Sequence, residues 1–367
     1  MELPTLKIGD LTAKYPIIQG AMGVGVSLSN LASSVANSGG VGVIAGVQIG
    51  FNEPDFRLNN QSANLRALKK HIKKARILSP EGILGVNLMV AMNNYKDMVL
   101  TCVNEKVDLI ISGAGLPKNL PELIKGSNTK IAPIVSSGKA AQLIMKLWAK
   151  KYDYLPDLII VEGPEAGGHL GFSEQELLST QKPKLEYLLA DVLNATRPFV
   201  EKYNKEVPVI AAGGIFDGQD IAKYLELGAS GVQMGTKFVA TEECDAHINF
   251  KQMYLNSRKQ NIQLVKSPVG LPGRAIRNEF LMKLDLGKIP VEFCYNCLRP
   301  CKPKTADYCI SDALINSVKG NVKDGLVFAG SNAYRVNKIT KVKDLISQLI
   351  TEAKNNYNET TLRQSFS

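Results

Sequence analysis

Short apolar runs rich in valine and isoleucine alternate with longer amphipathic stretches from Ile17 to Met234. Such runs predict strands buried on both faces of a parallel sheet, and the amphipathic stretches predict the helices that cover it. Eight runs occur, each followed by Gly, Ser or Asn and then a helical pattern: 17–19, 41–45, 84–90, 109–112, 131–135, 158–162, 207–212 and 231–234. Eight such units favour a closed (β/α)₈ barrel over an open doubly wound sheet.

The alternation stops after Met234. Residues 244–345 have the composition of helices and loops, and we expect them to form a lid over the barrel mouth. Val342 to Lys354 carries an apolar stripe that predicts a helix, and a polar tail follows Asn355. The predicted fold is therefore α/β, a TIM barrel with a smaller C-terminal helical and loop lid region. Its expected parts are the barrel (1–243), a lid or substrate region (244–345), and a C-terminal helix with its tail (346–367).

The composition and charge of the chain argue against several classes of function. The chain has 367 residues, of which 45% are hydrophobic and 21% charged, which suits a globular protein with a sizeable core. Its net charge of +10 comes from scattered lysines, which predicts a basic solvated surface and no nucleic-acid partner. No uncharged apolar run approaches the roughly 20 residues of a membrane helix, and Met1 to Pro4 does not open like a signal peptide. We therefore expect a cytoplasmic protein without a membrane partner.

Glycine-rich turns follow the last two predicted strands, at Ala211-Ala212-Gly213-Gly214-Ile215 and at Gln233-Met234-Gly235-Thr236. Glycine lets backbone N–H groups approach an anion closely, and Thr236 adds a hydroxyl. Any barrel needs some tight turns, so one such loop alone is ambiguous. Two on adjacent strands, where barrels commonly bind phosphate, favour a phosphate-bearing ligand.

A histidine follows the sixth predicted strand, within Glu162-Gly163-Pro164-Glu165-Ala166-Gly167-Gly168-His169. Imidazole exchanges protons near pH 7, and the carboxyl ends of barrel strands carry catalytic residues. The chain has only three histidines, and His169 alone is expected at this rim. The first strand ends in Gln19-Gly20-Ala21-Met22, whose small residues leave room for a flat ring. Asn87, on the third strand, is either a hydrogen-bond partner of that ring or a buried polar residue satisfied by backbone.

These four motifs, in this order and spacing between residue 15 and about residue 250, resemble the nitronate monooxygenase family, formerly called 2-nitropropane dioxygenase. The resemblance implies an FMN-dependent barrel enzyme with His169 as its catalytic base or proton donor. It implies phosphate contacts at Gly213, Gly214, Gly235 and Thr236. It also implies flavin contacts at Ala21, Met22, Asn87, Glu162, Gly167, Gly168 and Gln233. The best-studied members often have Gln where this chain has Glu162.

The resemblance leaves three functions open. A nitronate monooxygenase converts an alkyl nitronate and O₂ into a carbonyl compound and nitrite. The related enoyl-[acyl-carrier-protein] and quinone reductases have similar barrel motifs and take electrons from NADH or NADPH. A non-catalytic flavin-binding protein is the third alternative, and it gives His169 no proton role.

Cysteines cluster in the predicted lid as Cys294-x2-Cys297-x3-Cys301-x7-Cys309. Four thiolates suit zinc or an iron–sulfur cluster, and a cytoplasmic location disfavours disulfides. The spacing matches neither the usual zinc finger nor the bacterial ferredoxin pattern. Unliganded thiols in a packed loop are therefore an equal alternative to a metal site.

Overall fold

Eight parallel strands form one sheet in the computed structural model, which describes residues 2–357. They are β3 (Ile17–Gln19), β4 (Gly42–Ala45), β5 (Leu84–Met89), β6 (Leu109–Gly113), β7 (Lys130–Val135), β8 (Ile159–Glu162), β10 (Val209–Ala212) and β11 (Gly231–Met234). Neighbours in the sheet follow the order β3-β11-β10-β8-β7-β6-β5-β4. Each of the eight predicted strands is confirmed to within two residues.

Backbone hydrogen bonds close this sheet into a barrel. β3 and β4 stand at the two ends of the strand order, and a parallel bridge joins Ile18 to Val41. The Gln19 N–H donates to the Val41 oxygen at 2.9 Å, and the Val41 N–H donates to the Ile17 oxygen at 2.9 Å. The predicted (β/α)₈ TIM barrel is thereby confirmed.

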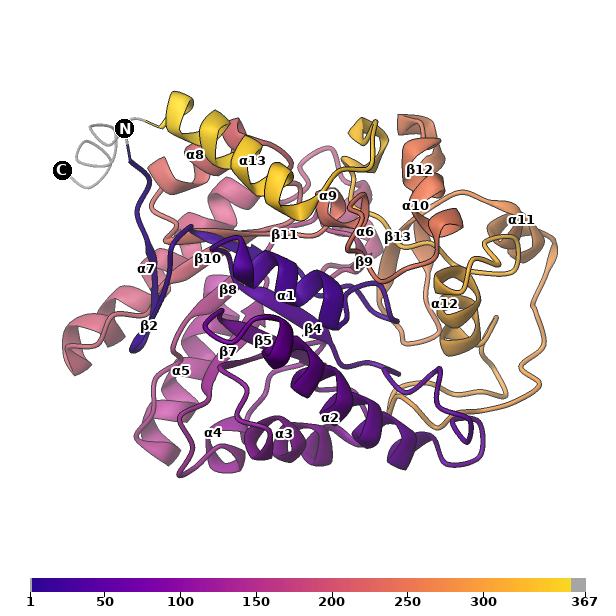
Figure 1. The fold of residues 1–367 in the computed structure, drawn as a ribbon, viewed down its shortest axis with the longest axis horizontal. Helices are drawn as coiled ribbons and strands as arrows, with labels where there is room; N and C mark the ends of the chain where they lie inside the picture. Colours follow the sequence, from indigo (N-terminus) through magenta and orange to yellow (C-terminus); the bar gives the residue numbers. More distant parts are fainter. Residues whose placement is uncertain (1, 358–367) are drawn as a thin grey trace.

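Helices surround the barrel, as Figure 1 shows. Those that follow the strands are α1 (Ser29–Asn37), α2 (Asn60–Leu78), α3 (Tyr95–Asn104), α4 (Leu120–Leu123), α5 (Gly138–Tyr152), α6 (Glu174–Leu178), α7 (Leu185–Tyr203), α8 (Gly218–Glu226) and α9 (Thr236–Val239). The predicted terminal helix, α13 (Val342–Asn356), packs on α8 and α1 and so covers the barrel beside its last strand. Within residues 2–357, no helix has the length and apolar character needed to cross a membrane.

A hairpin that the sequence analysis did not predict lies at the amino-terminal end of the barrel. Its strands, β1 (Leu6–Ile8) and β2 (Leu11–Ala13), pair in antiparallel fashion. The side chains of Leu6 and Ile8 are fully buried in one cluster with inward-facing strand residues such as Ile18. Asp10, in the hairpin turn, pairs at 2.5 Å with Lys130, the first residue of β7. The hairpin therefore seals the end of the barrel opposite the carboxyl ends of the strands.

The C-terminal region differs from the predicted mixture of helices and loops. It contains the helices α10 (Ile248–Leu255), α11 (Glu279–Leu286) and α12 (Ile310–Val318), with short 3-10 helices at Lys259–Asn261 and Ala333–Arg335. It also contains two antiparallel strands, β12 (Ile262–Lys266) and β13 (Pro272–Ile276). β13 also pairs with β9 (Gly168–His169), so the histidine loop and the C-terminal region share one small sheet of order β12-β13-β9. Residues 358–367 of the expected tail lie outside the described residues.

Candidate active site

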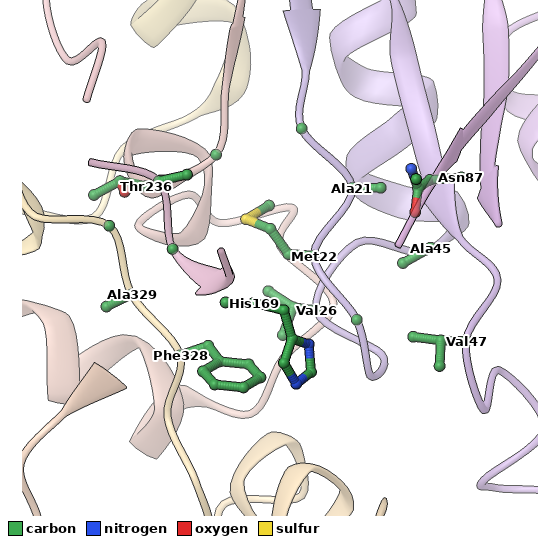
Figure 2. A pocket seen from close by; sticks show the side chains of 18 of the residues that line it. Ala21, Met22, Val26, Ala45, Val47, Asn87, His169, Thr236, Phe328 and Ala329 are labelled. Atoms are coloured by element: carbon green, nitrogen blue, oxygen red, sulfur yellow. The ribbon is translucent and has the colours of Figure 1, made fainter. Parts of the chain in front are cut away.

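One cavity of about 290 Å³ opens at the carboxyl ends of the barrel strands. This volume lies near the lower end of the roughly 300 to 1,000 Å³ usual for ligand sites. His169 and every residue predicted to contact the cofactor line it: Ala21, Met22, Asn87, Glu162, Gly167, Gly168, Gly213, Gly214, Gln233, Gly235 and Thr236. In Figure 2, Thr236 and Asn87 lie on opposite sides of the view, with Met22 between them.

The glycine turns after β10 and β11 form one end of this cavity. Gly213 and Gly214 have φ angles of +97° and +89°, in the left-handed region that favours glycine. The backbone amides of Gly214, Gly235 and Thr236 donate no hydrogen bond to another residue in the described part of the chain. Unpaired amides beside a free hydroxyl are suitable ligands for an anion.

His169 lies on β9, where its backbone pairs with Gly273 of β13. Its Nε2 atom is 2.7 Å from the hydroxyl oxygen of Ser267, a buried residue. Its ring packs edge-on against the ring of Phe328, and the two ring centres are 5.1 Å apart. Figure 2 shows the two rings side by side. Burial lowers the pKa of His169 to about 4, so the imidazole is neutral at pH 7.

Glu162 ends β8 and contributes a carboxyl group to the cavity. Burial raises its pKa to about 7, and no other group among the described residues contributes to that shift. The nearby Glu165 behaves differently, because its hydrogen bonds to Lys182 and Ser331 outweigh the effect of burial and lower its pKa. At neutral pH the cavity therefore has one ionised carboxylate and one that is close to its midpoint.

The loop that follows Glu162 and carries Glu165 is held by Arg274, on β13. Its guanidinium donates to the backbone oxygens of Pro164 at 2.6 Å and of Ala166 at 2.7 Å. Among the described residues that line the cavity there is neither lysine nor arginine. Any anion bound there must be held by neutral donors.

The sequence analysis missed the segment 328–332, which crosses the site between the histidine loop and the glycine turns. Phe328 packs on His169, and the Asn332 amide donates to the Gly214 oxygen at 2.6 Å. A Cβ at Gly167 would lie 2.6 Å from the Ala329 carbonyl carbon, so glycine is required by close approach of this segment. The run of small residues Ala329-Gly330-Ser331 is the feature of the sequence that could have indicated this segment. Other missed lining residues from this region are Tyr254, Cys297, Leu298, Ile310 and Ser311.

The four lid cysteines are free thiols, and Cys294 is exposed. Within the described chain, no group of three His, Cys, Asp or Glu side chains is arranged to hold a metal ion, so the geometry supports neither of the two predicted metal sites, zinc or an iron–sulfur cluster. All four nevertheless line one small cavity next to the barrel mouth. Cys297 lines both this cavity and the larger one.

The fold and the site define a class: a (β/α)₈-barrel protein with a rim cavity that ends in glycine turns with unpaired amides and has a neutral histidine in its wall. A family model described as nitronate monooxygenase matches residues 5–352. The chain therefore belongs to the nitronate monooxygenase family and is an enzyme of the flavin-dependent oxidoreductase class.

Relatives agree with this assignment. A protein of Staphylococcus saprophyticus named probable nitronate monooxygenase is 28% identical over 311 residues, which are 78% of this chain and 82% of the relative. A protein of Staphylococcus aureus with the same name is 27% identical over 76% of this chain and 81% of its own length.

Solved structures share the whole architecture. FabK from Thermotoga maritima superposes with a TM-score of 0.73 at 27% identity, covering 96% of each chain. The nitroalkane oxidase of Streptomyces ansochromogenes has a TM-score of 0.72 and covers 97% of this chain and 98% of its own, and its 21% identity makes it similar in fold alone.

The depressed pKa of His169 predicts a specific pH dependence of stability. Between about pH 6.5 and pH 4 the unfolded chain takes up a proton at this residue while the folded chain does not, so the free energy of unfolding falls as the pH falls. Above pH 6.5 His169 is unprotonated in both the folded and the unfolded chain, so it no longer makes the free energy of unfolding depend on pH. Across this pH window the free energy of unfolding of the wild type should fall by about 1 to 2 kcal/mol more than that of His169→Gln. This figure allows for partial exposure of the His169 side chain.

Urea denaturation of both proteins at pH 7, 6 and 5 measures this difference. His71, whose pKa burial also lowers to about 4, contributes equally to both proteins and cancels. Parallel declines in stability would show that His169 is not held neutral by the fold.

Proposed function

We propose that this protein is an FMN-dependent nitronate monooxygenase, which converts an alkyl nitronate and O₂ into a carbonyl compound and nitrite. Family membership and the two staphylococcal relatives support this reaction. The observation that carries it is the neutral imidazole of His169 in the wall of a cavity whose far end is a phosphate-type turn. With a cofactor bound at that turn, His169 would serve as a hydrogen-bonding and proton-exchanging group beside it.

The residues present fit FMN. Open amides at Gly214, Gly235 and Thr236, together with Gly213, would hold the phosphate without a cationic side chain. Ala21, Met22, Gly167 and Gly168 leave space for a flat ring, and polar atoms of Asn87, Glu162 and Gln233 are available to its heteroatoms and to the ribityl chain. When bound, FMN supplies the redox chemistry of the reaction.

The side chains of this protein then bind and orient the substrate. Because Nε2 of His169 is engaged with Ser267, Nδ1 is the ring nitrogen left to hydrogen-bond a nitronate oxygen or to exchange a proton. Ser267 is thus a positioning residue for the imidazole. Below about pH 7 the carboxyl group of Glu162 is neutral, so it does not repel an anionic substrate.

A second candidate is an NADH- or NADPH-dependent reductase acting on an enoyl thioester or a quinone. Two observations favour it. No lysine or arginine among the described lining residues balances the charge of a nitronate, and FabK is a structural neighbour at 27% identity. In this reaction His169 serves as proton donor or orienting group for an uncharged substrate.

Replacement of Thr236 tests the cofactor site independently of turnover. Thr236→Val keeps the shape of the side chain but removes a hydroxyl that would donate to a charged phosphate, a contact of about 1.5 to 3 kcal/mol. The dissociation constant for FMN, measured by flavin fluorescence in the apoprotein, should rise at least about tenfold. The matched Thr351→Val, on the exposed face of α13, should bind FMN like the wild type. If all three proteins bind FMN with equal affinity, the phosphate of FMN is not bound at this turn.

An anaerobic absorbance experiment separates the candidate reactions. If the protein is a nitronate monooxygenase, propyl nitronate reduces the bound flavin while NADH and NADPH do not. Bleaching by NADH or NADPH alone supports the reductase. A flavin band that no reagent bleaches contradicts both enzymatic reactions.

His169→Ala distinguishes these enzymes from a flavin-binding protein. The variant should retain FMN and lose turnover by about 100-fold or more, the usual contribution of a positioned acid or base. Turnover equal to that of the wild type would show that His169 has no proton or binding role. Retained FMN excludes misfolding as the cause of a loss.

Glu162 predicts a pH dependence of nitronate binding. As the pH rises through about 7 the carboxyl group ionises and repels the anionic substrate, so KM for propyl nitronate should rise several-fold between pH 6 and pH 8. In Glu162→Gln, which keeps the shape and cannot ionise, KM should stay nearly constant over the same range. A variant with the same pH profile as the wild type would exclude Glu162 as the titrating group.

A further inference from the structure

One helix of the C-terminal region, α12, forms part of the wall of the active-site cavity. Ile310, Leu314 and Ser317 are four and three residues apart, so they lie on one face of the helix, and all three line the cavity. Ser311 and, in the preceding loop, Leu298 also line it. These five residues are called the α12 wall below. Its larger side chains are all aliphatic.

Two valines of the barrel rim add to this apolar surface. Val26 follows β3 and Val47 follows β4, and both line the cavity. Figure 2 shows Val47 on the side of the view away from Thr236, which belongs to the glycine turns. The α12 wall is joined to the same segment, because the side-chain nitrogen of Gln48 donates to the Ser311 hydroxyl oxygen at 3.0 Å. The apolar surface therefore includes the part of the cavity away from the unpaired amides.

The two hydroxyl groups of the α12 wall already use their protons within the protein. The Ser311 hydroxyl donates to Cys297 Sγ at 3.2 Å. The Ser317 hydroxyl donates to the backbone oxygen of Leu314 at 2.9 Å. A hydroxyl has a single proton to donate, so neither serine offers a hydrogen-bond donor to a ligand.

Other polar side chains near the α12 wall are engaged in the same way. The side-chain oxygen of Gln48 accepts from the amide of Asn64 at 3.0 Å, and its nitrogen donates to Ser311. The hydroxyl of Tyr254, which also lines the cavity, donates to the backbone oxygen of Phe328 at 2.6 Å. The wall therefore behaves as an apolar surface although serine, tyrosine and glutamine contribute to it.

The charges of the cavity are unfavourable for a second anionic group on a substrate. Neither lysine nor arginine occurs among the described lining residues, and hydrogen bonds keep the pKa of Glu165 below its usual value, so this carboxyl group is ionised at neutral pH. A carboxylate placed against the α12 wall would lose its water without gaining a partner. An alkyl group has no such loss and gains from leaving water.

We propose that the α12 wall binds an uncharged alkyl chain of the substrate, which makes the enzyme selective for nitronates with longer chains over short ones and over those with a second anionic group. This inference rests on the proposed function, because it names the class of nitronate that the site accepts. Leu314, in the middle of the wall, is the residue expected to determine this specificity. Each methylene group that the wall buries should strengthen binding about threefold to fourfold.

Binding of linear carboxylates to the FMN-loaded protein tests the proposal. A carboxylate resembles a nitronate in shape and charge but gives no electrons to a flavin. Dissociation constants are measured from the change in flavin absorbance at pH 6, where the carboxyl group of Glu162 is mostly neutral. From butanoate to hexanoate the dissociation constant should fall about threefold to fourfold for each methylene.

Hexanedioate separates chain length from charge, because it has the length of hexanoate and a second carboxylate at the far end. It should bind at least about 30-fold more weakly than hexanoate, since its second charge would be buried without a partner. A dissociation constant that does not fall with chain length, or hexanedioate that binds as tightly as hexanoate, would overturn the proposal.

A matched pair of variants locates the chain on α12. Leu314→Ala removes an aliphatic side chain that lines the cavity, and Ile315→Ala removes its neighbour, which is equally buried but does not line the cavity. In Leu314→Ala each added methylene should improve binding by less than about twofold, whereas Ile315→Ala should keep the wild-type series. A wild-type series in Leu314→Ala would contradict the assignment to this wall. If that variant does not fold, the series of the wild type decides the matter.

The same chain-length dependence is expected in kcat/KM for ethyl, propyl, butyl and hexyl nitronates. Reduction of the flavin by propyl nitronate reports on the reaction itself, whereas the carboxylates report on the wall alone. A protein that oxidises nitronates without regard to chain length contradicts only this inference. A protein that binds hexanoate well but is not reduced by any nitronate contradicts the proposed function.

Discussion

The hydrogen bonds between β3 and β4 are the constraint on which the site depends. They join the first strand of the barrel to the second, and so they bring β3 between β4 and β11. Since all eight strands are parallel, closure places every strand end on one rim. The Ala21-Met22 segment, the turns after β10 and β11 and the loop after β8 then line the same cavity. An open sheet would leave β3 and β4 at opposite edges.

The rim alone does not complete the site. Ser267, which fixes the orientation of His169, and Phe328, which packs on its ring, both come from the C-terminal region. Arg274 of that region holds the loop between β8 and β9 through two backbone oxygens. The barrel therefore provides the end of the cavity formed by the glycine turns, and the later part of the chain provides the surroundings of the imidazole.

The barrel and most of the cavity wall were predictable because their signals are local. Apolar runs fix the strands, and the glycine turns and His169 follow those runs directly in sequence. The small sheet was not predictable in this way. β9 has only two residues, and it forms because β13, about a hundred residues later, offers a partner edge. In β12 the first three residues are half-buried, Val265 is buried and Lys266 is exposed, so the strand lacks a continuous apolar run.

The contacts of His169 with Ser267 and with Phe328 share this difficulty, because each joins segments far apart in the chain and leaves no periodic pattern in the sequence. For the cysteines the spacing indicated a shared site but left its occupant open between zinc, a cluster and no metal. The arrangement in space supports neither metal, because no three of the described His, Cys, Asp or Glu side chains are grouped to hold an ion.

Pairing of β9 with β13 has a consequence for how substrates enter. The imidazole sits on a strand whose neighbour belongs to the covering region, so the two cannot separate without disrupting the backbone ladder at Gly273 and Arg274. Any conformational opening that lifts this cover must carry the imidazole of His169 with it. Such an opening would move the imidazole away from the glycine turns, so the two ends of the cavity face one another only while the cover is shut.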